Sequence, residues 1–196
     1  MCPKKPEESV KIQKMIELRC ITQLWKDKQL DIYFADESGF SLTPYIPYHW
    51  GKKGVQSPIF SKKGVVYNVF GLMSPEQKLV SYLTEGSINS QFIIKALDDF
   101  SAKLTKFTVV VLDNAPWHRS RWIQAKIKKW EQKGLFLFFL PTYSPHLNKI
   151  ETLWRFMKYQ WIKSRDYINR KTIQDAIKNI LRKFGTEYKI DFSMNY

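Results

Sequence analysis

Hydrophobic residues follow two different spacings along this chain, and these predict alternating strands and helices. Residues 107–112 (FTVVVL) are mostly apolar and β-branched, which is typical of a strand buried on both faces. Residues 89–104 place apolar side chains every three or four positions, which is typical of a helix with one buried face. The expected elements, in chain order, are a helix over 8–25, strands over 32–35, 65–73 and 78–83, a helix over 89–104, a strand over 107–112, a helix over 120–133, a strand over 135–140, and helices over 147–161 and 172–185.

Turn-forming residues separate these segments. Residues 74–77 (SPEQ) join two strands into a hairpin, and residues 36–39 (DESG) are expected to form a turn after the first strand. Residues 43–64 are rich in Pro, Gly and Lys and are expected to be a loop. We expect strand 135–140 to be buried, like strand 107–112, and Thr172 and Asp175 to suit the start of the last helix. The order of elements predicts an α/β fold, a mixed sheet of about five strands flanked by helices.

Length and composition narrow the class of protein. The chain has 196 residues, 44% of them hydrophobic, which is enough to bury the core of one domain. We therefore divide it into an N-terminal helical arm (1–29) and one domain (30–196) that includes the C-terminal helices. The two cysteines, Cys2 and Cys20, form no C-x-x-C pair, which excludes a disulfide framework and favours a reducing compartment. With neither a long apolar run nor an apolar leader, the expected location is the cytoplasm, with no membrane partner.

Positive charge is concentrated in the last part of the chain. The formal net charge is +14, and residues 119–196 hold 17 basic against 6 acidic residues, a net of +11. A solvated helical surface would explain an isolated basic helix. An asymmetry of this size favours a polyanionic partner such as nucleic acid.

Three acidic residues occupy positions that are typical of catalytic or ligand-binding sites. Asp36 and Asp113 each follow an apolar strand, and ligand sites in α/β sheets gather at the carboxyl ends of strands. Glu151 lies in helix 147–161, on a stripe with Arg155 and Lys158, beside the apolar stripe expected to face the core. Simpler explanations remain open, because Asp often begins a turn and Glu151 with Arg155 can form a surface ion pair.

Three converging carboxylates without His or Cys partners suit Mg²⁺ or Mn²⁺. Two such ions can activate a water or hydroxyl and stabilise the leaving oxygen of a phosphoryl displacement. A basic protein with such a site has the chemistry of a nuclease or strand transferase.

Three blocks of the sequence resemble the catalytic blocks of the DDE transposases, in particular the mariner-like superfamily in its bacterial insertion-sequence branch. The blocks are residues 36–40 (DESGF), 112–120 (LDNAPWHRS) and 140–154 (LPTYSPHLNKIETLW), and the resemblance covers roughly residues 30–165. It implies an RNase H-like fold, two Mg²⁺ (or Mn²⁺) ions, and DNA cleavage followed by strand transfer. Asp36, Asp113 and Glu151 match the metal-binding triad, so that domain 30–196 is expected to be the DDE catalytic domain.

The resemblance also implies partners. These are double-stranded DNA, as transposon ends and target, and a second copy of the chain in a homodimer on DNA. Full-length relatives carry N-terminal helix-turn-helix modules, whereas about 30 residues precede the first catalytic strand here. We therefore expect a separate helix-turn-helix polypeptide, a truncated remnant or a domain fragment. The expected location becomes the nucleoid of a bacterial cytoplasm.

Several residues near the triad are candidates for contacting DNA. Asn114, His118 and Arg119 follow Asp113 and could orient metal-bound water or DNA phosphates, and a loop-stabilising role is an equal alternative. The further candidates are Arg155, Lys158, Lys52 and Lys53. The turn at Tyr143–His146 is interpreted as structural.

Two other functions remain open. One is a catalytically silent transposase remnant that only binds DNA, and the other is a stand-alone RNase H-like nuclease or resolvase. A serine or cysteine hydrolase is disfavoured because the chain has no G-x-S-x-G motif, and a zinc site is disfavoured because the histidines and cysteines are scattered.

Overall fold

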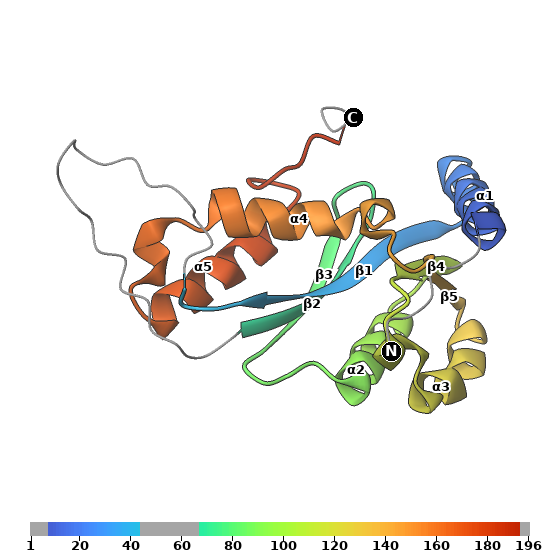
Figure 1. Cartoon of the computed structure of the whole chain (residues 1–196), viewed down its shortest axis with the longest axis horizontal. Coiled ribbons are helices and arrows are strands. Elements are labelled where there is room, and N and C mark those ends of the chain that lie inside the picture. The colour runs from blue at the N-terminus through green and yellow to red at the C-terminus, as the bar shows by residue number, and fades with distance from the viewer. Residues whose placement is uncertain (1–7, 44–66, 193–196) are drawn as a thin grey trace.

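The structure is a computed structural model that describes residues 8–43 and 67–192. Most of the loop expected over 43–64, together with Lys52 and Lys53, therefore lies outside the described residues. The centre of the fold is a mixed five-stranded sheet with strand order β3-β2-β1-β4-β5 (Figure 1). Its strands are β1 (Asp31–Phe40), β2 (Tyr67–Met73), β3 (Leu79–Thr84), β4 (Thr108–Leu112) and β5 (Leu135–Phe139). The predicted α/β class and five-stranded sheet are confirmed.

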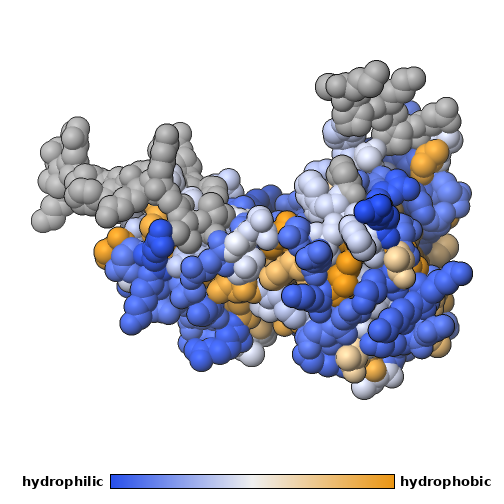
Figure 2. All heavy atoms as spheres, turned by 90° about the horizontal axis from the view of Figure 1, so that it is seen from below, coloured by the Kyte–Doolittle hydropathy of each residue, from blue (hydrophilic) through white to orange (hydrophobic). Residues whose placement is uncertain are grey.

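Helices cover both faces of the sheet (Figure 1). One hydrophobic core joins the sheet to α1 (Glu8–Lys26), α4 (Ile150–Phe156) and α5 (Arg170–Lys183). The core on the other face joins it to α2 (Ser90–Ser101) and α3 (Arg121–Glu131). In the view of Figure 2, hydrophilic residues cover most of the surface, with smaller hydrophobic areas scattered among them. Among the described helices, none is both long and apolar enough to cross a bilayer.

Strand β1 is longer than the sequence pattern predicts. The expected turn at 36–39 is wrong, because these residues continue β1 and pair with β2, from Phe34 opposite Met73 to Phe40 opposite Tyr67. The antiparallel ladder with β2 supplies backbone partners that turn-forming residue types would otherwise lack. Asp36 therefore lies within a strand, and only Asp113 stands directly after one.

Strand β5 is at the edge of the sheet and is only partly buried. It pairs in parallel with β4 alone, and Phe136 is 38% exposed. The expectation of a buried strand is wrong here, because an apolar run indicates a strand but not whether both of its edges are paired.

The C-terminal helices differ in detail from the sequence prediction. The helix expected over 147–161 is divided into the 3-10 turn η2 (Pro145–Leu147), α4 and the π-helical turn η3 (Met157–Trp161). The short 3-10 turn η4 (Ser164–Tyr167) leads to α5. Helix α5 is capped by Asn169, whose side chain accepts from the Thr172 N–H, and the Thr172 hydroxyl accepts from the Asn169 N–H.

Candidate active site

Asp36 lies on the face of β1 that packs against α4. Strand alternation puts Phe34 and Phe40 on this same face, in the core that includes Ile150 and Trp154 of α4. Burial, together with repulsion from Glu151, Glu37 and Asp113, raises the pKa of Asp36 to about 8. A nearby cation would therefore lower the cost of ionising Asp36.

Asp113 follows β4 and is held by two hydrogen bonds. The Ala115 N–H donates to Asp113 Oδ1 over 3.0 Å, and His118 Nδ1 lies 2.6 Å from the same oxygen. Burial alone would raise the pKa of Asp113, but these two hydrogen bonds hold it below its ordinary value. The loop thus fixes Asp113 as a carboxylate.

His118 joins two carboxylates from different strands. Its ring is fully buried in the 3-10 turn η1 (Pro116–Arg119), and Nε2 lies 2.8 Å from Glu37 Oε1 of β1. Although burial alone would lower the pKa of His118, the hydrogen bonds to Asp113 and Glu37 raise it to about 10. At neutral pH the imidazolium donates from both nitrogens. Because both ring nitrogens of His118 are hydrogen-bonded, the ring is placed to hold Asp113. Because the ring is buried, direct contact between His118 and DNA is disfavoured.

Glu151 lies in the first turn of α4, and Asn148 ties that turn to β1. Asn148 Nδ2 donates to the Ala35 carbonyl over 3.0 Å, and the Asn148 carbonyl accepts from the Glu151 N–H over 3.1 Å. Burial raises the pKa of Glu151, although Lys158 acts in the opposite sense and Asp113 adds repulsion. The fold therefore brings Asp36, Asp113 and Glu151 close enough to repel one another.

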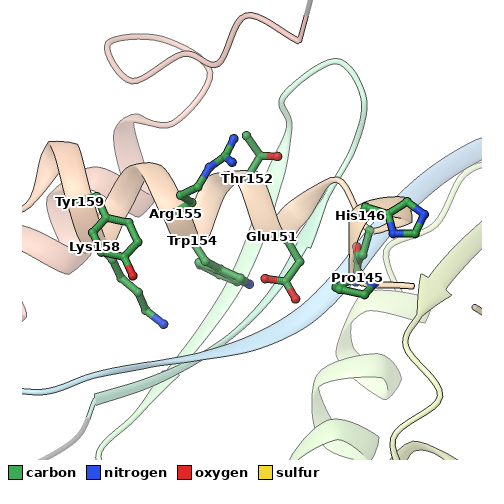
Figure 3. Close-up of a pocket in the computed structure, with 9 residues that line it drawn as sticks. Pro145, His146, Glu151, Thr152, Trp154, Arg155, Lys158 and Tyr159 are labelled. Carbon is green, nitrogen blue, oxygen red and sulfur yellow. The ribbon is translucent and has the colours of Figure 1, made fainter. Parts of the chain in front are cut away.

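Two surface hollows meet at Glu151. One, of about 330 Å³, is lined by Asp113, Asn114, Tyr143, Asn148 and Glu151 among others. The other, of about 550 Å³, extends along α4 and η3 past Trp154, Arg155 and Lys158 (Figure 3). Figure 3 shows Glu151, Trp154 and Lys158 directed toward the strands, whereas Arg155 points away from them. The expected stripe of Glu151, Arg155 and Lys158 is therefore divided between two sides of the helical segment formed by α4 and η3.

Two other DNA-contact candidates lie together in the loop after β4. Arg119 Nη1 donates to Asn114 Oδ1 over 3.3 Å. Arg119 is exposed, and Asn114 lines the smaller hollow.

Lys158, a further candidate, extends over the Phe40 ring, with Nζ 5.6 Å from the ring centre. Burial lowers the pKa of Lys158, although Glu151 and Asp36 act in the opposite sense.

The structure adds four residues to this region that the sequence reasoning did not single out as functional. They are Glu37, Tyr143, Asn148 and Trp154. Glu37 and Asn148 lie inside the quoted blocks, but their partners are 81 and 113 residues away. Tyr143, interpreted as structural, is 61% exposed at the hollow and has a left-handed backbone (φ 58°). Among the described residues, no three His, Cys, Asp or Glu side chains converge closely enough to hold a metal ion as they stand.

The sequence profile of the DDE superfamily endonucleases matches residues 31–174, which include all three carboxylates. The chain belongs to this superfamily. It is thus an endonuclease domain by family, and the expected relationship to transposases is confirmed.

Curated and solved relatives agree with this assignment. The "Insertion element IS630 uncharacterized 39 kDa protein" of Shigella sonnei is 27% identical over 127 residues, covering 63% of this chain and 36% of the relative. The crystal structure of the Mos1 strand transfer complex matches with a TM-score of 0.58 at 12% identity, covering 94% of this chain and 58% of that one. The crystal structure of the mariner Mos1 paired end complex with Mg matches with a TM-score of 0.59 at 11% identity, covering 92% and 57%. The two structural matches confirm the RNase H-like fold. The chain spans 36% of the length of the insertion-element relative.

Proposed function

We propose that residues 30–196 are the catalytic domain of a DNA transposase, which cleaves phosphodiester bonds and transfers DNA strands with the help of divalent metal ions. The observation that carries the proposal is that Asp36 on β1, Asp113 after β4 and Glu151 on α4 lie near enough for their carboxylates to repel one another, with two hollows meeting at Glu151. In this division, residues 1–29 remain an N-terminal arm.

The residues around the triad fit two Mg²⁺ or Mn²⁺ ions. The donors are carboxylate oxygens, which these ions prefer, and their mutual repulsion would be relieved by positive charge. Ser38 Oγ and Asn148 Oδ1 are buried near Asp36 and Glu151 without a hydrogen-bond partner in the described part of the chain, as acceptors for metal-bound water would be. Bound there, the ions would activate a water or 3′-hydroxyl and stabilise the leaving oxygen.

The chain's own residues would prepare the site. His118 holds Asp113 Oδ1 in one orientation by bridging Asp113 to Glu37, which leaves Asp113 Oδ2 as the oxygen that would bind a metal in the hollow. Arg155 and Lys158 border the larger hollow, where they would bind phosphate oxygens of the DNA backbone. Asn114 and Arg119 would contact the backbone on the side of the smaller hollow.

The partners in this proposal are the transposon ends and the target DNA, bound by a homodimer in the nucleoid of a bacterium. Two of the similar solved structures are a Mos1 strand transfer complex and a Mos1 paired end complex with Mg. They support strand transfer and Mg²⁺ as expectations for this chain. In this proposal the transposon ends are recognised by helix-turn-helix modules of the kind that full-length relatives carry.

A cleavage assay tests the proposal. A labelled duplex that carries one inverted repeat of the element should be nicked in Mg²⁺ or Mn²⁺, and Asp113→Asn should lower the rate at least a hundredfold, because a carboxylate ligand is lost. Asp175→Asn, an exposed change on α5 outside both hollows, is the matched control and should cut at the parent rate. Equal nicking by Asp113→Asn and parent would contradict the assignment.

The same assay separates the alternative functions. A silent remnant would shift the duplex in a gel without cutting it, and a resolvase would cut without joining the 3′-hydroxyl to a second DNA. Joined products, seen as labelled strands longer than the substrate, are the result expected of a transposase.

A further inference from the structure

Trp154 carries a buried N–H group that lacks an acceptor. Its side chain is 3% exposed, and Nε1 has no hydrogen-bond partner among the described residues. Two other tryptophans donate to carboxylates, Trp130 to Asp98 over 2.8 Å and Trp25 to Glu76 over 2.7 Å. A buried donor without an acceptor costs stability, so the Trp154 N–H requires an explanation.

Loose packing does not explain it, because the Trp154 ring is fixed on the sheet. A Cβ on Gly71 would lie 2.8 Å from its Cη2 atom, and the ring packs edge-on against Phe40 with the centres 6.3 Å apart. Gly71 is opposite Asp36 in the β1–β2 register. The indole is therefore held beside the strand pair at the level of Asp36.

Glu151 is an acceptor on the same helix that can approach this N–H. It precedes Trp154 by three residues on α4, which puts the two side chains on neighbouring parts of one helix face. Both line the larger hollow, and Figure 3 shows both directed toward the strands. A cation beside Asp36 would draw the Glu151 carboxylate toward β1, and hence toward the indole.

We propose that Trp154 is a positioning residue, whose indole N–H donates a hydrogen bond to the Glu151 carboxylate when that carboxylate binds a divalent metal. One Glu151 oxygen then faces the metal while the other accepts from Nε1. Carboxylate ligands of metals are commonly held by such hydrogen bonds. The inference rests on the proposed function, because it requires metal binding by the triad.

The test follows the indole N–H directly. In ¹H–¹⁵N spectra of the intact chain, the Trp154 indole resonance, assigned by its contacts to Gly71 and by its absence from Trp154→Phe, should move downfield as Mg²⁺ is added. The same resonance should not move in Glu151→Ala. Trp154→Phe keeps an aromatic ring against Gly71 and should weaken Mg²⁺ binding about tenfold by calorimetry.

The matched control is Trp161→Phe, which changes a partly buried tryptophan that packs against Phe156 and Tyr188 outside the larger hollow. It should bind Mg²⁺ like the parent. An unmoved Trp154 resonance at saturating Mg²⁺ would overturn the proposal, even if Trp154→Phe proved unfolded. A resonance that moves only when DNA is added would overturn it in favour of a phosphate acceptor.

Failure of this proposal is distinguishable from failure of the proposed function. A parent chain that binds Mg²⁺ and cuts DNA while its indole resonance stays still contradicts the role of Trp154 alone. A parent chain that neither binds Mg²⁺ nor cuts DNA contradicts both.

Discussion

The carboxyl group of Asp36 lies where the protein opposes its ionisation. Burial and the neighbouring carboxylates raise its pKa from an ordinary value of 3.8 to about 8. Without metal, folding therefore favours the protonated form of Asp36. The contribution of this carboxyl group to the free energy of unfolding is fully present below pH 3.8 and is lost as the pH rises through 8. In the proposed metal site, affinity for a cation and stability without one would be opposed at this residue.

Asp36→Asn should consequently stabilise the metal-free protein at alkaline pH. In EDTA at pH 8.5 we expect a gain on the order of 6 kcal/mol in the free energy of unfolding, because the amide carries no charge to bury and the pKa of Asp36 is raised from 3.8 to about 8. At pH 4 the variant and the parent should unfold alike. Urea unfolding followed by circular dichroism at both pH values measures the difference.

Added Mg²⁺ supplies the control for this prediction. It should raise the melting temperature of the parent, because a ligand that binds only the folded state stabilises it, and should have a much smaller effect on Asp36→Asn. A variant less stable than the parent in EDTA at pH 8.5 would contradict the prediction.

The link through His118 shows what sequence patterns cannot supply at the scale of single residues. Asp113 and Glu151 could be chosen from their places in the pattern and in the three blocks. The partner of His118 on β1 could not, because Glu37 is 81 residues away and only the parallel pairing of β1 with β4 brings the two together. Of the two roles expected for His118, contact with DNA or stabilisation of the loop, its buried bridge between Asp113 and Glu37 favours the second.

At the scale of elements, helix α4 depends on a close approach to β2. Trp154 reaches the sheet only because Gly71 has no side chain, and the atoms of its ring would lie 2.8–2.9 Å from a Cβ at that position. The distance between α4 and the sheet also sets the distance between Glu151 and Asp36. Packing at one glycine and geometry at the site are therefore connected.

Gly71→Ala should both destabilise the protein and lower its activity. The added methyl group must displace Trp154 and α4, at a cost of about 1–3 kcal/mol in the free energy of unfolding, and should reduce cleavage more than tenfold. Chemical unfolding and the duplex cleavage assay measure the two effects.

Gly86→Ala is the matched control, because its Cβ would have only Thr84 Oγ1 nearby, at 3.7 Å. It should change neither stability nor cleavage appreciably. If Gly71→Ala behaved like this control, the close contact between α4 and β2 would not matter to the site.

The elements themselves were largely predictable, and the exceptions have physical causes. Apolar runs and helical spacing predict the described strands and helices to within a few residues. The pattern fails at residues 36–39, where pairing with β2 overrides turn-forming composition, and at β5, where position in the sheet decides burial. It also fails within 147–161, because a π-helical turn leaves no clear trace in apolar spacing.

At the scale of the whole molecule, the net positive charge favours a polyanionic partner. Of the net +14, a net of +11 falls after residue 118, where it is shared between α3 on one face of the sheet and α4 and α5 on the other. Each phosphate contact made by a cation releases counterions, and this makes DNA affinity fall with added salt. The number of contacts can thus be read from the salt dependence.

Arg155→Gln should weaken DNA binding at every sequence tested and lower the slope of log affinity against log salt by about 0.9, the value of one phosphate contact. Fluorescence anisotropy with a labelled duplex at several salt concentrations measures it. Lys103→Gln, an exposed change on the α2 side of the sheet where Lys103 pairs with Asp99, is the charge-matched control. Equal slopes for the two variants would remove Arg155 from the DNA interface.

The two adjacent acids of β1 serve opposite sides of the sheet, Asp36 toward α4 and Glu37 toward His118. Inserting or deleting one residue between the start of β1 and Asp36 would exchange the two faces, since successive strand side chains alternate. Such a change would leave composition and charge almost untouched and would still disconnect both acids from their partners. Length variation among descendants of this gene should therefore accumulate in the connections between strands, while the stretch from Asp31 to Asp36 keeps its number of residues.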